Sequence, residues 1–361
     1  MNQEESILVA IHCLVYNHEP YLRDCFDGFV MQKTNFRFVA IVHEDCSTDH
    51  SADIIREYEA KYPDIFRPIY ETENQYSKPD GSLGRIMNEA IAATGAKYIA
   101  MCEGDDYWTD SYKLQKQVDF MEAHLDVGLC FSDFNIYEEN TGVLRKAMYK
   151  NGMHRSKDFE DHLISCGYIA PMTWLARKSE YGRLVSSLPH TDGSFAVALD
   201  FFAQSKVAFI DAVTATYRVH NNSASRQSEP FKRWKYEYGV MLTQIEYAKK
   251  FGSNNLVEKV LMNNYLVDLL PLAIELEKKD FIEEARAFLE MHNIDFEKYY
   301  NYLRDLLSEE KRYNLVCQSY SYRIGRFLLY PVRAAKSKIE EVLLVLRTGG
   351  GKKRRYFITY S

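Results

Sequence analysis

Short apolar runs alternate with amphipathic stretches over the N-terminal third of the chain. Runs rich in β-branched residues predict buried strands, and apolar residues spaced every three or four positions predict helices. The predicted strands are residues 7–13, 36–43, 66–70, 97–102 and 127–132. The predicted helices between them are residues 19–31, 51–61, 83–94 and 110–124. Such strand–helix alternation predicts an α/β fold, with a mostly parallel, doubly wound sheet flanked by helices.

The pattern changes further along the chain. It is less regular over residues 133–212, predicts one more strand over 212–220, and is helical from about residue 231. We therefore expect three parts: an α/β domain over residues 1–230, a helical region over 231–315, and a tail over 316–361.

The composition is that of a folded protein. Of the 361 residues, 46% are hydrophobic and 27% are charged, which excludes intrinsic disorder as the main state. The seven cysteines show no C-x-x-C spacing and lie partly in the apolar runs, as expected for free thiols in a reducing compartment. No signal peptide and no apolar run long enough to span a bilayer is recognised, so we expect a cytoplasmic location.

Charge is distributed unevenly along the chain. The tail over 316–361 carries ten Lys and Arg against two acids, whereas the whole chain has a net charge of −6. Apolar residues alternate with the basic ones, which is typical of an interfacial amphipathic segment. We expect peripheral binding to the cytoplasmic face of the inner membrane, with packing on the acidic body as the alternative. The acidic body argues against nucleic acid as a partner.

Three polar clusters follow predicted strands: residues 16–19, 44–49 and 103–106. Because ligands bind at the carboxyl ends of parallel strands, these clusters are expected to form one site. The third cluster contains Glu103, Asp105 and Asp106, and clustered carboxylates usually need a cation between them. Such oxygen ligands suit Mg²⁺ or Mn²⁺ bound together with substrate phosphates. The alternative is a solvated acidic turn that caps the next helix.

The chain has no glycine-rich phosphate loop. A phosphorylated ligand would then be neutralised by a metal ion and by basic side chains such as Arg85 or Lys113. A surface salt bridge is the alternative for Arg85. His220 is a candidate metal ligand, although a lone histidine is more often structural.

Four motifs occur together in a familiar order: Leu14-Val15-Tyr16-Asn17, Glu44–Asp49, Asn88 with Gly95–Ile99, and Glu103–Trp108. With Tyr217-Arg218-Val219-His220 further on, the chain resembles a family 2 glycosyltransferase over about residues 5–225. The resemblance implies a glycosyltransferase-A type, Rossmann-like sheet that binds a nucleotide-sugar donor, with UDP expected.

The resemblance also implies roles for individual residues. Asp105 and His220 would bind the metal ion, Arg85 would approach the diphosphate, and Asp45 would contact the base. The remaining donor-binding residues implied are Val15, Tyr16, Asn17, Glu19, Glu103 and Asp106. Trp108 and Trp174 are candidate platforms for the acceptor sugar, with burial in the core as the alternative.

The resemblance places an acidic catalytic base at Asp192, and Asp161 and Glu160 are rival candidates. The base would deprotonate the hydroxyl of a glycan or lipid-linked acceptor, with inversion at the anomeric carbon. The metal ion and Arg85 would stabilise the leaving nucleoside diphosphate. Two other readings remain open: a nucleotidyltransferase or sugar-nucleotide hydrolase using the same carboxylates, and a binding module without catalysis.

Overall fold

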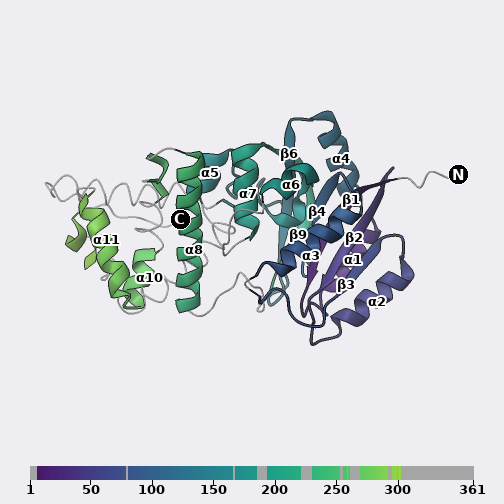
Figure 1. Cartoon of the computed structure of the whole chain (residues 1–361), viewed down its shortest axis with the longest axis horizontal. Coiled ribbons are helices and arrows are strands. Elements are labelled where there is room, and N and C mark those ends of the chain that lie inside the picture. The colour runs from purple at the N-terminus through teal and green to yellow at the C-terminus, as the bar shows by residue number, and fades with distance from the viewer. Residues whose placement is uncertain are drawn as a thin grey trace. The chain divides into compact units, whose positions relative to one another are not determined.

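The computed structural model describes residues 6–78, 80–165, 167–184, 193–220, 230–252, 255–257, 259–260, 269–291, 295–298 and 300–301. The chain divides into two compact units (Figure 1). Unit 1 comprises Met1–Asn151 and Arg155–Arg226, and unit 2 comprises Gly152–His154 and Gln227–Ser361. Each unit is described by itself below.

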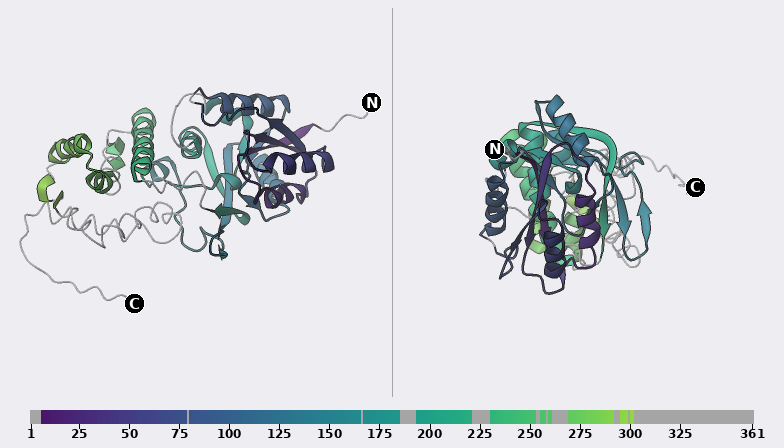
Figure 2. Two further views of the ribbon diagram at one scale, coloured as in Figure 1. Left: turned by 90° about the horizontal axis from the view of Figure 1, so that it is seen from below. Right: turned by 90° about the vertical axis from the view of Figure 1, so that its right-hand side faces the viewer.

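Unit 1 is an α/β layer structure, and helices lie on both sides of its sheet (Figure 2). Its strands are β1 (Ile7–Val15), β2 (Arg37–Glu44), β3 (Phe66–Tyr70), β4 (Tyr98–Met101), β5 (Tyr107–Trp108), β6 (Val127–Glu138), β7 (Val143–Arg145), β8 (Leu175–Arg177) and β9 (Lys206–Val219). Its helices are α1 (Leu22–Val30), α2 (Ser51–Lys61), α3 (Ser82–Ala93), α4 (Lys113–Ala123), α5 (Phe159–Ile164), the 3₁₀ turn η1 (Pro171–Thr173), α6 (Lys178–Leu184) and α7 (Gly193–Gln204).

Four neighbouring strands form the parallel half of the sheet, in the order β3-β2-β1-β4. Strand β1 is central, and its residues Val9–Ile11 are fully buried because both faces are covered. In the register of β1 and β2, Val15 lies opposite Glu44. The carboxyl ends of β1, β2 and β4 therefore lie at one edge of the sheet.

The second half of the sheet continues as β8-β6-β9-β5 and mixes directions. Strand β8 is antiparallel to both β4 and β6, so β6 runs in the same direction as β4. Strand β9 is parallel to β6. Strand β9 therefore runs in the same direction as β4, and the carboxyl ends of the two strands lie at the same edge of the sheet.

The predicted fold class is confirmed for the described residues. Strand β3 and helix α2 have the predicted bounds, and the other N-terminal elements differ by a few residues at their ends. The three-residue strand β8 was not predicted, because so short a run carries no periodic signal. Strands β6 and β9 extend well beyond the predicted 127–132 and 212–220, since they pair with each other over most of their length.

From residue 230 on, the described part of unit 2 is mainly helical. It contains α8 (Pro230–Phe251), α10 (Leu270–Glu275) and α11 (Lys279–Met291). Helices α10 and α11 pack against each other, as do α8 and α10. The basic tail over 316–361 lies outside the described residues. In the part of the chain that is described, no helix is long and apolar enough to cross a membrane.

Candidate active site at the carboxyl ends of the parallel strands

The loops after β1 and β2 are locked together by side chains. The backbone N–H of Asn17 donates to the hydroxyl of Ser47, and the side-chain oxygen of Asn17 accepts from the N–H of Thr48 at 2.7 Å. Asn17 has a positive φ of 55°, a conformation that asparagine tolerates better than most residues. Glu19 continues this connection, because its carboxylate accepts from the N–H of His50 at the start of α2. Asn17 and Glu19 thus lie where the sequence placed them, at the end of β1.

Asp45 follows β2 and is 4% exposed. Its backbone N–H donates to the carbonyl of Val15, which fixes it beside the end of β1. Both carboxylate oxygens accept hydrogen bonds from backbone N–H groups, one from Gln75 at 2.6 Å and one from Tyr76 at 3.0 Å. Asp45 therefore holds the segment after β3 against this edge of the sheet. The side chain of Tyr16, beside Val15, is 45% exposed at the same place.

The acidic loop after β4 turns tightly around Gly104. A Cβ atom at this position would lie 2.8 Å from Nδ1 of His18 and 2.9 Å from Cδ2 of Leu22. Glycine is thus required because the His18 ring packs directly against the loop backbone. The side chain of Glu103 is exposed, whereas Asp106 is buried. The loop therefore presents its three carboxylates to different surroundings.

Asp105 lies between two histidines. Its Oδ2 is 3.0 Å from Nε2 of His220 and 3.9 Å from Nε2 of His18. Burial alone opposes ionisation of Asp105, but the hydrogen bond with His220 and the charges of both imidazoles outweigh it and lower its pKa. Burial lowers the pKa of His18. The structure therefore joins the two predicted metal ligands and adds His18, which the sequence analysis did not select.

Asp106 is a different kind of acid. Burial, followed by the adjacent charge of Asp105, raises its pKa well above the usual value. Its Oδ1 accepts a hydrogen bond from the backbone N–H of Arg218 at 2.8 Å. Asp106 therefore connects the acidic loop to β9, in agreement with the pairing of β5 with β9. This contact is a structural role for a residue that was expected at the donor sugar.

Arg218 ties three segments to the acidic loop. Its side chain is 5% exposed and donates to the carbonyl of Asp105, to Glu139 at 2.6 Å and to Asp24 at 2.5 Å. Asp24 belongs to α1 and Glu139 follows β6, so one guanidinium connects α1, β6 and the loop. Three tyrosine rings lie within 6 Å of the guanidinium carbon: Tyr21, Tyr107 and Tyr137. Arg218 therefore fixes the loop that carries Asp105.

Asp105 and His220 offer a carboxylate oxygen and an imidazole nitrogen 3.0 Å apart, two donors that could hold a divalent cation in place of the hydrogen bond between them. Among the described residues, no three His, Cys, Asp or Glu side chains are arranged to hold a metal ion. The protein would thus supply two ligands and leave the remaining positions to phosphate oxygens and water. Mg²⁺ prefers oxygen ligands, so the imidazole nitrogen is the less typical of the two donors for that ion.

Arg85 and Lys113 have partners other than Asp105 in the described structure. Arg85 is exposed on the first turn of α3 and donates to the carbonyl of Asp80, which is the surface alternative. Lys113 is fully buried and donates to Gln117 at 2.6 Å. Burial lowers the pKa of Lys113 to about 7. The expectation that Lys113 neutralises phosphates is wrong for this conformation, because its ammonium group is enclosed in the core.

Trp108 and Trp174 lie in the core rather than at a sugar site. Their side chains are 2% and 0% exposed, and each indole N–H donates to a backbone carbonyl, that of Met172 and that of Ile169 respectively. Neither ring presents a face to an acceptor. The prediction of an acceptor platform is corrected to the core alternative, since both rings are enclosed and that of Trp108 packs against Phe29 of α1.

The predicted base Asp192 lies outside the described residues. The carboxylate of the rival Asp161 accepts from the N–H of Lys157, and the backbone N–H of Asp161 donates to the carboxylate of Asp158, the N-cap of α5. Glu160 is exposed on the same helix. The choice among Asp192, Asp161 and Glu160 stays a prediction.

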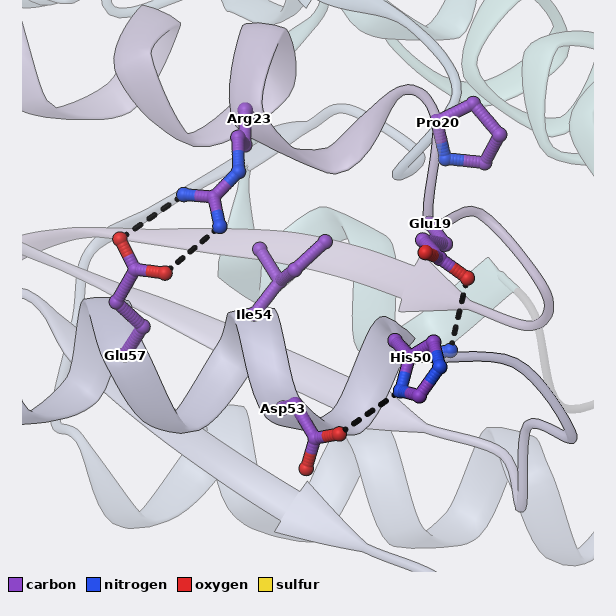
Figure 3. A pocket seen from close by; sticks show the side chains of 7 residues that line it. All are labelled: Glu19, Pro20, Arg23, His50, Asp53, Ile54 and Glu57. Carbon is purple, nitrogen blue, oxygen red and sulfur yellow. Dashed lines mark hydrogen bonds and ion pairs between the residues drawn. The ribbon is translucent and has the colours of Figure 1, made fainter.

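An open hollow of about 580 Å³ lies between α1 and α2 (Figure 3). Arg23 forms a two-pronged ion pair with Glu57 across it, and His50 pairs with Asp53 on its floor. All four side chains are more than half exposed. The hollow is therefore bounded by solvated ion pairs, and neither Asp105 nor His220 lines it.

Sequence reasoning missed the groups that surround Asp105. His18 and Tyr21 occupy the first turn after β1, among the predicted residues Tyr16, Asn17 and Glu19. Arg218 stands two residues before His220 in the final motif, which was the one available signal. Asp24 and Glu139 gave no signal, because their roles depend on which segments the fold brings to Arg218.

Residues 11–181 match the family described as Glycosyl transferase family 2. An uncharacterized protein of Mycobacterium tuberculosis (strain H37Rv) is 39% identical over 134 residues, which cover 37% of this chain and 36% of the relative. The match thus spans about a third of the length of that curated relative.

Two solved structures share the fold. The crystal structure of residues 1–349 of S. aureus TarS in complex with UDP-GlcNAc aligns with a TM-score of 0.54 at 15% identity, over 88% of this chain and 92% of that chain. The mannosyltransferase PcManGT from Pyrobaculum calidifontis, in complex with GDP-Man and Mn²⁺, aligns with a TM-score of 0.51 at 15% identity, over 88% and 85% of the two chains. At this identity the likeness concerns the fold.

Proposed function

We propose that this chain, in which residues 11–181 match glycosyltransferase family 2 and whose fold is of the glycosyltransferase-A type, transfers a sugar from a nucleoside diphosphate sugar to a hydroxyl acceptor. The observation that carries the proposal is the contact of Asp105 with His220 at 3.0 Å, at the edge where β1, β2 and β4 end. Both structural neighbours were solved with a nucleotide sugar, UDP-GlcNAc in one and GDP-Man in the other. A nucleotide-sugar donor, with UDP favoured, is therefore our proposal for this chain.

The donor would lie along the ends of β1 and β2. Tyr16 offers an exposed ring beside Val15, and Asn17 and Glu19 hold the two loops in place. Asp45 would act on the base through the segment that it clamps, since both its carboxylate oxygens already accept backbone hydrogen bonds. Arg85 would approach the diphosphate only after leaving Asp80.

The diphosphate would be bound through Mn²⁺ or Mg²⁺. Asp105 and His220 would hold the ion, which supplies charge stabilisation for the departing nucleoside diphosphate. Asp105 is suited to this task because an aspartate is ordinarily ionised at neutral pH. Arg218 would hold the acidic loop in place while negative charge develops on the leaving group, because its backbone and side chain bind both Asp106 and Asp105.

The acceptor hydroxyl needs a base, because an alcohol is a poor nucleophile at neutral pH. We assign this role to Asp192, with Asp161 and Glu160 as rivals. A single base that acts opposite the leaving group leads to inversion at the anomeric carbon. The contacts proposed for the donor do not depend on which of the three acids is the base.

Turnover of nucleotide sugars tests the proposal. We expect release of nucleoside diphosphate from one of UDP-glucose, UDP-GlcNAc or GDP-mannose, with Mn²⁺ present and not with a chelator. Loss of this release in His220→Ala, in a variant that keeps its thermal unfolding temperature, would support the site. Release of a nucleoside monophosphate instead would favour the alternative of a sugar-nucleotide hydrolase. No turnover and no binding of any donor would favour a binding module.

The basic tail suggests where the acceptor lies. Residues 316–361 combine ten Lys and Arg with apolar residues, which suits an anionic membrane surface and a lipid-linked acceptor. We expect the full chain to float with vesicles that contain anionic lipid and not with neutral ones. Equal recovery of the full chain and a variant ending at residue 315 would contradict this proposal.

A further inference from the structure

Tyr21 occupies the centre of the group around Asp105. Its ring centroid is 4.6 Å from that of His220, with an interplanar angle of 32°, and 6.4 Å from that of His18. The guanidinium carbon of Arg218 lies 5.0 Å from the centroid of the same ring. One tyrosine therefore contacts both imidazoles that face Asp105 and the cation that holds its loop.

The backbone fixes Tyr21 firmly. The N–H groups of Tyr21 and Leu22 both donate to the carbonyl of His18, which closes a tight turn at the start of α1. Tyr21 is the N-cap residue of α1, and its carbonyl accepts from the N–H of Cys25. The ring thus projects from a rigid helix start rather than from a loose loop.

An imidazole joined to Asp105 by one hydrogen bond can still rotate about its own bonds. Packing against a fixed ring removes that freedom, and aromatic pairs at this separation attract each other beyond their simple burial. The side chain of His220 is 4% exposed, and Tyr21 contributes a wall of the space that it fills. Residues that orient a metal ligand in this way commonly change metal affinity by about 10- to 100-fold when they are replaced.

We infer that Tyr21 is a positioning residue that holds the imidazole of His220 aimed at Asp105, and so sets the affinity of this site for a divalent cation. The inference rests on the proposed function, because it assumes that Asp105 and His220 bind a cation together. The ring carries this role, and the hydroxyl is not needed for it. Tyr21 acts through His220 and touches no reacting atom.

Titration with Mn²⁺ in the presence of UDP tests the inference. We expect Tyr21→Leu to weaken Mn²⁺ binding about tenfold, while Tyr21→Phe restores the wild-type value because it keeps the ring. Tyr137→Leu is the matched control. It removes a tyrosine from the surroundings of Arg218 but leaves the ring pair of Tyr21 and His220 in place. Equal Mn²⁺ affinity in Tyr21→Leu and Tyr137→Leu would overturn the inference.

A nuclear magnetic resonance measurement separates this inference from the proposed function. The ring proton signals of His220 should be single and sharp in the wild type and in Tyr21→Phe, and should broaden or split in Tyr21→Leu, because the imidazole then samples several orientations. If the wild type binds neither Mn²⁺ nor UDP, the proposed function fails, and these signals still decide whether Tyr21 orients His220. Tyr21→Met provides the same comparison if Tyr21→Leu does not fold. Single, sharp His220 signals in both ring-removing variants would overturn the inference.

Discussion

Two neighbouring residues of α1 reach two very different clusters of charge. Arg23 forms its ion pair with Glu57 in the open hollow, where both side chains are about half exposed. Asp24 accepts from Arg218, whose side chain is 5% exposed and surrounded by tyrosines. The hollow is the more obvious cavity (Figure 3), yet the second cluster holds Asp105.

The difference between the two clusters is the burial of the guanidinium, since the side chain of Arg218 is 5% exposed although its partners Asp24 and Glu139 are 60% and 38% exposed. An exposed ion pair gains little, because water and salt screen it and two long side chains must be ordered. A buried guanidinium interacts more strongly with its partners and is costly to leave without them. We therefore base the proposed site on the burial of its charged groups and not on the shape of a cavity.

Removing the buried cation should give the largest effect. We expect Arg218→Ala to lower the free energy of unfolding by about 3 kcal/mol, because the hydrogen bonds to Glu139, Asp24 and the Asp105 carbonyl and the packing of a buried side chain are lost together. Denaturant unfolding measures this change. Arg23→Ala is the control and should cost much less, because its ion pair is exposed. Equal costs for the two variants would remove the contrast between the clusters.

Lys113, a second buried basic residue, extends the comparison. Lys113 donates to Gln117 and lies 4.3 Å from the ring of Trp108, and burial lowers its pKa from 10.5 to about 7. Between these two values the unfolded chain binds the proton and the folded chain does not. Stability should therefore rise with pH from about 7 and level off above 10.5.

Lys113→Met removes this contribution. Relative to that variant, the wild type should gain about 2 kcal/mol of unfolding free energy between pH 7.5 and 9.0, at 1.36 kcal/mol for each pH unit. Denaturant unfolding of both proteins at several pH values measures the difference. A wild type whose stability runs parallel to that of Lys113→Met over this range would show that Lys113 is charged in the folded protein.

A buried anion provides the next test. In Asp45→Asn one of the two accepting oxygens is lost, so either Gln75 or Tyr76 keeps an N–H without its partner. We expect a loss of about 1.5 kcal/mol, with faster hydrogen exchange at both amides. Exchange at the amides of α2 serves as the internal reference. Unchanged exchange at Gln75 and Tyr76 would mean that Asp45 does not clamp this segment.

The smallest effect belongs to the hollow. A double-mutant cycle of Arg23→Ala with Glu57→Ala should give only a small coupling at low salt, because both side chains are about half exposed. In 1 M NaCl most of this coupling should disappear, since the screening length is then about 3 Å. A large coupling that persists in high salt would place this pair in the same class as Arg218.

The sequence predicted the parallel half of the fold well. Strands β1 to β4 and helices α1 to α3 repeat a clear pattern, and their polar ends mark one edge of the sheet. The mixed half was less predictable, since β8 has three residues and its direction depends on contacts with β4 and β6. Sequence periodicity carries no information about such long-range pairing.

The candidate site was predicted in part. Asp105 and His220 were selected together and meet in the structure, 115 residues apart in sequence. The tryptophans were misplaced because burial depends on packing from η1 and α1, which their own sequence surroundings do not reveal. The roles of Tyr21 and Arg218 were not predicted for a related reason. Each role depends on residues that become neighbours only when the chain folds.

The most direct test of the account is calorimetric titration with UDP, with and without Mn²⁺, on the wild type, Asp105→Ala and Arg23→Ala. The account predicts that the wild type and Arg23→Ala bind UDP when Mn²⁺ is present, and that Asp105→Ala loses this binding by at least about 100-fold. Undiminished Mn²⁺-dependent binding in Asp105→Ala, or its loss in Arg23→Ala, would contradict the assignment of the donor site to the buried cluster.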